Sequence, residues 1–367
     1  MSNYYNPVKI IKTEDWLREL NFRLNDLKIS APIIVTTPGN RKRLKLDSKF
    51  DSDSIFSDVG SNPNFEECTN ALKFCQKIMI DGVVAIGGGS AMDLAKVVKA
   101  HLCLEKSDIF ELIEYKDKYP KTFPSIFLPT THGTASEVTM WGTVWNINEE
   151  KKYSISHPDL YPSIAILDGN LTLSLPMDIS ITTTMDALSH SFESIWNKKA
   201  NDTSTDLAIS AICSILKNGS ALKENPDDLD IRNNLLRASS VAGLAFSNTT
   251  TAAAHSISYP LTIHHGIPHG VASSISLLPL LDINGKLIKE PLDIICNNNE
   301  LTYDELKQTI KEIPQGVVPY TLDKWGISED QLPTLADESF TKGRMDNNIV
   351  DLTTDDVLGI LKELYSE

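Results

Sequence analysis

The sequence has few cysteines, no long apolar run and a shortage of basic residues. Its five cysteines are odd in number and form no CxxC pair, so they predict reduced thiols rather than a disulfide framework. The longest apolar stretch, residues 271–281, is shorter than the roughly 18 residues that a membrane span needs. The first residues also lack the basic-then-apolar order of a signal peptide. We therefore expect a cytoplasmic protein with no membrane partner.

Acidic side chains outnumber basic ones by 49 to 34, which gives the chain a formal charge of −15. Such a surface repels phosphodiester backbones, so nucleic acid is not an expected partner. A small anionic substrate remains compatible with this charge, because a local cationic pocket can sit inside a negative surface. The 367 residues are enough for two domains of roughly 100–200 residues each.

The first half of the chain alternates short β-branched runs with helical stretches. Strands are expected at 32–36, 82–86 and 125–128, and helices at 64–79 and 91–102. This alternation predicts a parallel sheet with right-handed crossovers. From about residue 177 the pattern is helical throughout. We therefore expect an α/β domain over residues 1–177 and an all-helical domain over residues 178–367.

Two polar turns follow expected strands. Gly87-Gly88-Gly89-Ser90 leads into an expected helix, where close backbone approach and free amides favour a pyrophosphate; the alternative is a tight turn without a ligand. The second turn, residues 129–137, is rich in hydroxyls that can bond a ribose or phosphate, or can cap the following turn. Ligands bind beyond the carboxyl ends of parallel strands, so the two turns together favour a nucleotide.

The helical half holds an acid–histidine pair and a histidine cluster. Asp186 and His190, at i and i+4, share one helix face, and four of the eight histidines fall between His255 and His269. One carboxylate with imidazoles and no thiolate suits Fe(II), Zn(II), Mn(II) or Ni(II). A metal beside a nicotinamide acts as a Lewis acid on a carbonyl oxygen. The residues therefore favour metal-assisted hydride transfer.

These motifs resemble those of the iron-containing (group III) alcohol dehydrogenases. Gly87-Gly88-Gly89-Ser90-x-x-Asp93-x-Ala95-Lys96 is similar to the family's phosphate loop, and Pro129-Thr-Thr-x-Gly133-Thr-x-Ser136-Glu137 to its second nucleotide turn. Asp186-Ala-Leu-x-His190-x-x-Glu193 and His255-x13-His269-Gly270 are similar to its metal-ligand segments.

The resemblance implies a Rossmann-like α/β domain with a parallel sheet and an all-α C-terminal domain, the fold that dehydroquinate synthases share. It also implies NAD(P), a divalent metal that is Fe(II) or Zn(II), reversible reduction of an aldehyde or ketone, and a homodimer. The implied metal ligands are Asp186, His190, His255 and His269. The expected cofactor contacts are Thr37, Gly39, Arg41, Gly87, Gly88, Gly89, Ser90, Asp93, Thr130, Thr131, Thr134 and Ser136.

Two positions depart from the family pattern. Many members carry a second histidine four residues after the third ligand, where this chain has Tyr259, so Tyr259, His265 or water would relay the proton. The turn after the first expected strand lacks the acid that NAD-preferring members place there and instead carries Arg41, Lys42 and Arg43. This set of cations can accept a 2′-phosphate, which favours NADPH over NADH.

Several segments resemble the phosphonoacetaldehyde reductase branch of the family, which interconverts phosphonoacetaldehyde and 2-hydroxyethylphosphonate. They predict substrate contacts by Trp141, Trp145, His264, Lys342 and Arg344. The alternatives are a general short-chain alcohol dehydrogenase, a glycerol-1-phosphate dehydrogenase-like enzyme and a non-catalytic metal- or nucleotide-binding protein. A dehydroquinate synthase-like lyase is disfavoured, because small and apolar residues flank His190 and His255 where that enzyme needs lysines and arginines.

Overall fold

The computed structural model describes residues 4–149 and 151–366, and the chain divides into two compact units. The α/β unit contains residues 6–131 and 135–174. The helical unit contains the chain from Leu175 onward, together with residues 4–5 and 132–134. The units part between Ser174 and Leu175, a few residues before the position expected from the change in sequence pattern.

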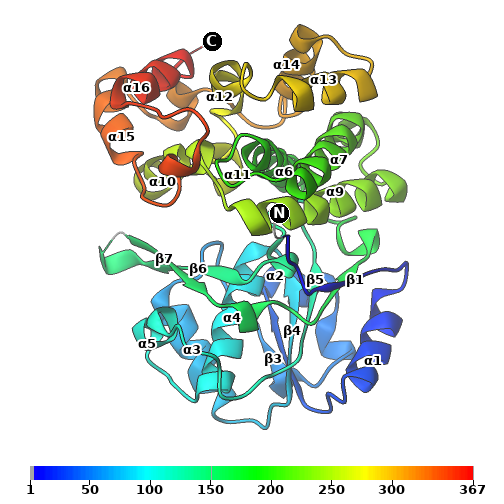
Figure 1. Cartoon of the computed structure of the whole chain (residues 1–367). Coiled ribbons are helices and arrows are strands. Elements are labelled where there is room, and N and C mark those ends of the chain that lie inside the picture. The colour runs from blue at the N-terminus through cyan, green and yellow to red at the C-terminus, as the bar shows by residue number, and fades with distance from the viewer. Residues whose placement is uncertain (1–3, 150, 367) are drawn as a thin grey trace. The chain divides into compact units, whose positions relative to one another are not determined.

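A six-stranded parallel sheet forms the centre of the α/β unit, with strand order β1-β8-β5-β4-β2-β3 (Figure 1). The strands are β1 (Lys9–Lys12), β2 (Pro32–Thr36), β3 (Ile55–Phe56), β4 (Gly82–Gly87), β5 (Ser125–Pro129) and β8 (Ile164–Leu167). The three strands expected from the sequence are the inner strands β2, β4 and β5. Apart from Thr36 and Ser125 their residues are apolar, and almost all are buried, as in strands covered on both faces.

The alternation of side chains along β2 assigns the helices to the two faces of the sheet. Ile33 and Val35 belong to the core shared with α3 (Phe65–Cys75), α4 (Gly89–Leu104) and α5 (Ile109–Glu114). Ile34 belongs to the other core, which includes Leu20 of α1 (Trp16–Asp26). The unit is therefore a three-layer arrangement of helices, sheet and helices (Figure 1).

An antiparallel hairpin, which the sequence pattern did not predict, lies outside this sheet. It pairs β6 (Trp141–Asn146) with β7 (Lys151–Ser156). Gly142 of β6 packs against α4, where an added Cβ would lie 3.0 Å from the Asp93 backbone. The hairpin therefore depends on a glycine at this point of close approach.

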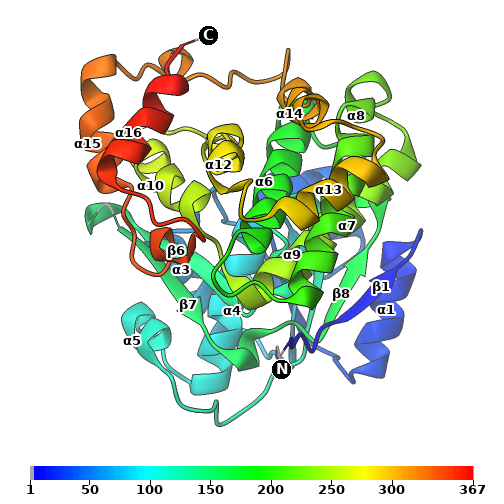
Figure 2. The same cartoon turned by 45° about the horizontal axis from the view of Figure 1, so that its top comes forward.

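Three long helices form the centre of the helical unit. Helices α6 (Met177–Ile195), α7 (Asp202–Gly219) and α9 (Leu229–Thr249) pack on one another, as Figure 2 shows. Asn201 caps α7 and Asp228 caps α9, because the side-chain oxygen of each accepts backbone amides of the first helical turn. The all-α prediction for this half is confirmed.

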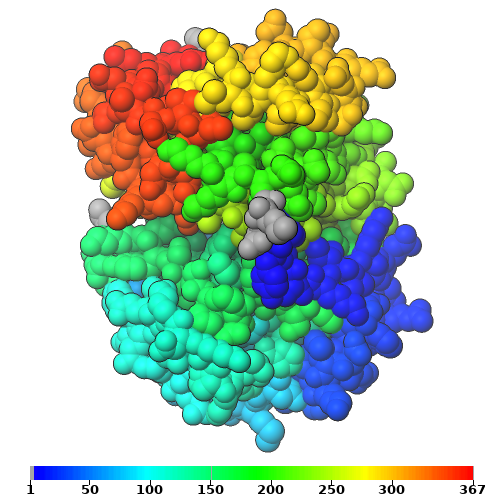
Figure 3. Space-filling view, in the orientation of Figure 1, coloured from blue at the N-terminus to red at the C-terminus, as the bar shows by residue number. Residues whose placement is uncertain are grey.

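Shorter helices complete the helical unit. They are α8 (Ala221–Glu224), α10 (Ala253–His265), α11 (His269–Ala272), α12 (Leu277–Asn284), α13 (Lys289–Asn298), α14 (Tyr303–Glu312), α15 (Leu332–Glu338) and α16 (Thr354–Glu363). The last two pack together, and their orange and red atoms lie side by side on the surface in Figure 3.

Among the described residues, no single helix has the length and apolar character needed to cross a bilayer. Two consecutive helical segments, residues 269–284 and Lys289–Asn298, are together long and apolar enough to cross a bilayer. The chain bends by 118° between them.

Candidate active site

The four expected metal ligands come from three helices of the helical unit. Asp186 and His190 lie one turn apart on α6, His255 lies in the first turn of α10, and His269 begins α11. Gly270 explains how α11 comes close enough, because an added Cβ there would lie 2.3 Å from the Thr182 carbonyl oxygen. The glycine after the fourth expected ligand is therefore needed for the close packing of α11 on α6.

Oδ1 of Asp186 is the common point of this cluster. It lies 3.5 Å from Nε2 of His255, 3.8 Å from Nε2 of His269 and 4.0 Å from Nε2 of His190. The donor atoms of Asp186, His255 and His269 all lie within 4.8 Å of one another. The His190 ring stacks on the His255 ring, with centroids 4.5 Å apart.

This spacing fits a shared divalent ion. Donor atoms that bind one ion with bonds of about 2.0–2.2 Å lie about 3–4 Å apart. The cluster also contains an orphaned donor atom, since Nε2 of His255 is buried and has no hydrogen-bond partner among the described residues. A carboxylate with imidazoles suits Fe(II), Zn(II), Mn(II) or Ni(II).

The charges of the cluster are strongly coupled. Burial raises the pKa of Asp186, but the charges of His190 and His269 outweigh it, so the pKa lies well below its usual range. Burial would lower the pKa of His255, yet Glu193 and Asp186 raise it to about 9. Burial lowers the pKa of His190 to about 4. For these residues to hold a metal ion, His255 would have to release a proton.

Two residues behind the cluster had no role in the sequence analysis. Ser273 donates from Oγ to Oδ1 of Asp186 at 2.7 Å. Glu193, on α6, accepts a hydrogen bond from Nδ1 of His255 at 2.5 Å. Glu193 carried a signal in the sequence, because an acid on an apolar helix face needs a buried partner. Ser273 carried none.

The glycine turn and the second polar turn meet at the carboxyl end of the sheet, as expected. An added Cβ at Gly88 would lie 3.0 Å from Cγ2 of Thr131, and the Thr130 amide donates to the Gly87 carbonyl at 3.0 Å. Gly88 is the N-cap of α4 and supplies no side-chain hydrogen bond to its first amides. The start of α4, from Gly89 and Ser90, is therefore suited to an anion such as pyrophosphate.

The turn after β2 joins the same edge of the sheet. Thr37 caps α2 (Pro38–Arg43), and Nδ2 of Asn40 donates to Oγ1 of Thr130 at 3.3 Å. An added Cβ at Gly39 would have open space around it, with its nearest atom 4.0 Å away. Arg41 forms an ion pair with Asp47 at 2.5 Å, which also raises the pKa of Arg41.

Other expected cofactor contacts are engaged within the protein. Ser90 donates to the Ser61 carbonyl at 2.5 Å, and Ser136 donates to Oδ1 of Asp93 at 2.7 Å. Asp93 is partly buried and also accepts the Thr143 amide at 2.9 Å. These contacts hold the second polar turn and the β6–β7 hairpin against α4. Thr134 belongs to the helical unit.

The expected proton relay and substrate residues fall into both units. Tyr259 lies one helical turn after His255 on α10, and its hydroxyl accepts from Nε of Arg344 at 3.3 Å. His264 pairs with Glu338 at 3.0 Å. Burial lowers the pKa of His265, and Lys342 is exposed. Trp141 and Trp145 share one face of β6 in the α/β unit.

His132 is a buried, neutral histidine in the helical unit. Neither of its ring nitrogens has a hydrogen-bond partner among the described residues. Burial, and then the charge of Arg232, lower its pKa to about 3. Because this value lies below the unfolded-state pKa of about 6.5, the unfolded chain binds the proton first as the pH falls.

His132 is therefore expected to make the protein less stable in mild acid. Between pH 7 and pH 5 its contribution should fall by about 2 kcal/mol. Urea unfolding of the metal-free protein and of His132→Leu at both pH values measures this change. The other titrating groups are shared, so the variant should lose less stability on acidification. Equal losses in the two proteins would contradict the assignment.

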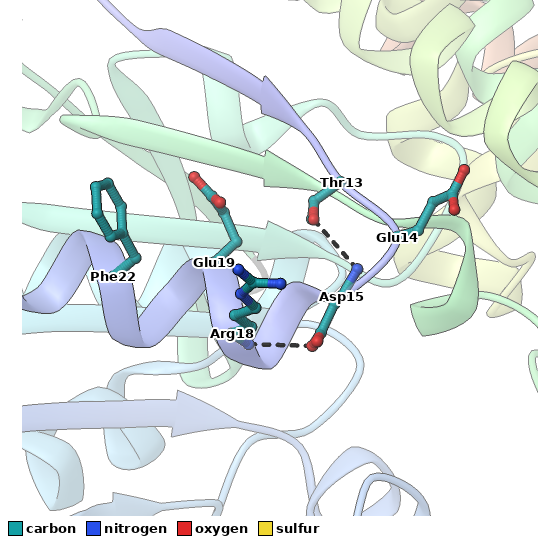
Figure 4. A pocket seen from close by; sticks show the side chains of 6 residues that line it. All are labelled: Thr13, Glu14, Asp15, Arg18, Glu19 and Phe22. Atoms are coloured by element: carbon teal, nitrogen blue, oxygen red, sulfur yellow. Dashed lines mark hydrogen bonds between the residues drawn. The ribbon is translucent and has the colours of Figure 1, made fainter.

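A pocket of about 410 Å³ lies at the start of α1 and contains none of the expected site residues (Figure 4). Its lining includes Phe22, Arg18 and three carboxylates, and Asp15 caps the helix through the Arg18 amide at 3.1 Å. The hydrogen bonds drawn in Figure 4, from the Asp15 amide to Thr13 and from the Arg18 amide to Asp15, are those of a capped helix N-terminus.

The α/β unit has nucleotide-type turns, and the helical unit has a carboxylate–histidine cluster. These two features are those of a metal-dependent oxidoreductase. Two protein-family profiles match it: "Iron-containing alcohol dehydrogenase" over residues 7–169 and "Fe-containing alcohol dehydrogenase family, C-terminal" over residues 180–365. The chain belongs to the iron-containing alcohol dehydrogenase family. The family and the fold expected from the sequence are thereby confirmed.

Individual relatives agree with this assignment. Long-chain-alcohol dehydrogenase 1 of Geobacillus thermodenitrificans is 31% identical over 308 residues, covering 79% of this chain and 76% of the relative. 4-Hydroxybutyrate dehydrogenase of Clostridium kluyveri is 28% identical over 334 residues, covering 86% and 87%. The crystal structure of sulfoacetaldehyde reductase from Bifidobacterium kashiwanohense in complex with NAD+ matches with a TM-score of 0.86 at 28% identity, covering 100% of this chain and 99% of that one. The chain is an oxidoreductase of the alcohol dehydrogenase type, and its family implies a metal and an NAD(H) cofactor.

Proposed function

We propose that this enzyme reversibly reduces a short aldehyde with an anionic head group, phosphonoacetaldehyde to 2-hydroxyethylphosphonate. The proposed metal ligands are Asp186, His190, His255 and His269. When bound, the metal supplies Lewis acidity toward the carbonyl oxygen, while the nicotinamide supplies the hydride. The remaining tasks, which are binding the head group and moving a proton, belong to side chains of the protein.

The position of Arg344 is the main observation that supports an anionic substrate. Its guanidinium donates to Tyr259, which lies one helical turn from the ligand His255. A fixed cation one side chain away from a metal ligand can bind the far end of a two-carbon substrate. Arg344 is half-buried, so its charge is less screened than that of a solvent-exposed arginine.

The proton that completes alcohol formation is assigned to Tyr259 and His265. Both lie on α10, which also carries His255. Burial lowers the pKa of His265 and so favours the neutral imidazole, which can accept a proton at one ring nitrogen and donate one from the other. Tyr259 is held by the same hydrogen bond that orients Arg344.

Sulfoacetaldehyde is the second candidate substrate. It differs from phosphonoacetaldehyde in its anionic group alone, and the solved structure of a sulfoacetaldehyde reductase is 28% identical over the whole chain. The related 4-hydroxybutyrate dehydrogenase is likewise named for a small molecule with an anionic end. Both similarities favour an anionic head group over a neutral aldehyde.

A direct comparison of substrates tests this function. Protein loaded anaerobically with Fe(II), and in parallel with Zn(II), is assayed with phosphonoacetaldehyde, sulfoacetaldehyde and propionaldehyde. We expect kcat/KM to be about 100-fold higher for phosphonoacetaldehyde than for the neutral propionaldehyde, which is about 2.7 kcal/mol of discrimination. Equal values for all three would indicate a general aldehyde reductase. Product formation without net NAD(P)H consumption would indicate the lyase alternative.

We expect Arg344→Met to separate charged from neutral substrates. Loss of a charged hydrogen bond worth about 1.5–3 kcal/mol should lower kcat/KM for the anionic aldehyde by about 10–100-fold. Reduction of propionaldehyde should fall much less, because it loses only the support that Arg344 gives to the Tyr259 hydroxyl. Lys362→Met, at an exposed lysine of α16, is the control that changes net charge equally. An equal loss on both aldehydes would rule out a head-group contact.

NADPH is the proposed cofactor, because the segment after β2 carries Arg41, Lys42 and Arg43 and no carboxylate. Asp47 holds the Arg41 guanidinium, and Lys42 is exposed. The same assay run with NADPH and NADH tests this choice. A preference of about tenfold or more for NADPH supports it, and a preference for NADH contradicts it.

A further inference from the structure

Glu193 is a buried acid on α6 whose hydrogen bonds all reach the start of α10. Its side chain is fully buried. Oε1 accepts the Ala252 amide at 3.0 Å and the His255 amide at 3.1 Å. Oε2 accepts from Nδ1 of the His255 ring at 2.5 Å. One carboxylate therefore holds both the backbone and the ring of His255.

The direction of the ring hydrogen bond fixes the form of the imidazole. A carboxylate has no hydrogen to give, so Nδ1 of His255 carries the hydrogen and donates it. Once Nε2 gives up its own proton it carries a lone pair, 3.5 Å from Oδ1 of Asp186, and it has no hydrogen-bond partner among the described residues. A neutral imidazole with the hydrogen on Nε2 could not bind an ion at this point.

We propose that Glu193 is the positioning residue that holds His255 as the Nδ1–H form and aims its Nε2 at the metal. The inference rests on the ligand set of the proposed function. Carboxylates behind metal-bound imidazoles generally fix ring orientation and raise ligand basicity. Here the same carboxylate also ties the ring to the first turn of α10, so backbone and ring cannot move independently.

Glu193→Gln tests the proposal while keeping the side chain's size. If the amide oxygen keeps the two backbone bonds, the amide NH2 faces Nδ1, which must then accept and leave the hydrogen on Nε2. If the amide flips, its NH2 faces two backbone donors. Either arrangement removes the ring from its binding form, so affinity for Zn(II), measured by competition with a chromophoric chelator, should fall by about 10–100-fold.

Glu67→Gln is the matched control. Glu67 also accepts two backbone amides, from Gly60 at 2.9 Å and Asn64 at 3.0 Å, but it lies in the α/β unit and holds no imidazole. Its Zn(II) affinity should equal that of the wild type. Co(II) loading gives a second readout, because the visible spectrum of the bound ion should change in Glu193→Gln and remain unchanged in Glu67→Gln.

The wild-type protein offers a measurement that does not depend on any variant's folding. In the Zn(II)-loaded protein, ¹⁵N shifts of the His255 ring should show a protonated Nδ1 and a coordinated Nε2. Coordination through Nδ1, or unchanged Zn(II) affinity in Glu193→Gln, overturns the proposal. If the wild type binds no divalent metal, the proposed function itself fails, which is a different result.

Discussion

Replacing Asp186 with asparagine is expected to abolish divalent metal binding and aldehyde reduction together. Oδ1 of Asp186 lies 3.5–4.0 Å from three imidazole nitrogens, so this one atom supplies the negative charge that the cluster shares. Loss of a residue behind a ligand lowers metal affinity by about 10–100-fold, and loss of a direct ligand should lower it further. Metal content after dialysis and kcat are the two measurements.

Asp168→Asn is the control for this substitution. Asp168 is also buried and accepts the amides of Trp16 at 2.8 Å and Asn170 at 2.9 Å, but it belongs to the α/β unit. This variant should retain its metal after the same dialysis. An Asp186→Asn protein that keeps one metal ion per chain and full turnover would falsify the ligand assignment.

Lys96→Met is expected to lower the free energy of unfolding by about 3–5 kcal/mol, because it leaves buried polar groups without their cation. Nζ of Lys96 donates to Oγ of Ser136 at 2.7 Å, Oγ1 of Thr139 at 2.9 Å and the Trp141 carbonyl at 2.6 Å. Burial lowers its pKa to about 8, so the amine is still charged at pH 7. The nearby carboxylate of Asp93 would lose its counter-charge.

Urea unfolding at pH 7, followed by far-ultraviolet circular dichroism, measures the loss. Lys42→Met, at an exposed lysine of α2, is the control and should change stability by less than about 0.5 kcal/mol. If Lys96→Met is as stable as this control, the three hydrogen bonds of Lys96 contribute little. The place of Lys96 in the glycine-turn motif would then require a different explanation, such as contact with the cofactor.

The sequence predicted three inner strands of the sheet and the long helices because their patterns are local. Strands β2 and β4 are runs rich in β-branched residues. Helices α6, α7 and α9 carry helical spacing, and α7 and α9 also have capping side chains. The two edge strands, β1 and β3, and the inner strand β8 escaped prediction for physical reasons. β3 has two residues, and β1 has four with a lysine at each end. β8 is an apolar run that periodicity alone cannot distinguish from a buried helix.

The candidate site, too, was predictable only where its pattern is local in the sequence. The spacing of Asp186 and His190 on one helix face was visible in the sequence, and the structure brings His255 and His269 to the same point. Their role as ligands remains a prediction. The pairing of Glu193 with His255 and of Ser273 with Asp186 depends on which helices meet. Likewise, nothing in the local pattern showed that Asp47 would hold Arg41.

The register of β1 has a consequence for how the chain folds during synthesis. Lys9 pairs with Ile164 and Lys12 with Leu167, so the first strand translated joins the sheet through the last one. While the intervening segment is being made, the nascent β1 has no neighbour to complete its backbone hydrogen bonds. Its exposed lysines, one at each end, discourage pairing with another chain in that interval. The order of translation thus leaves completion of the sheet until β8 has left the ribosome.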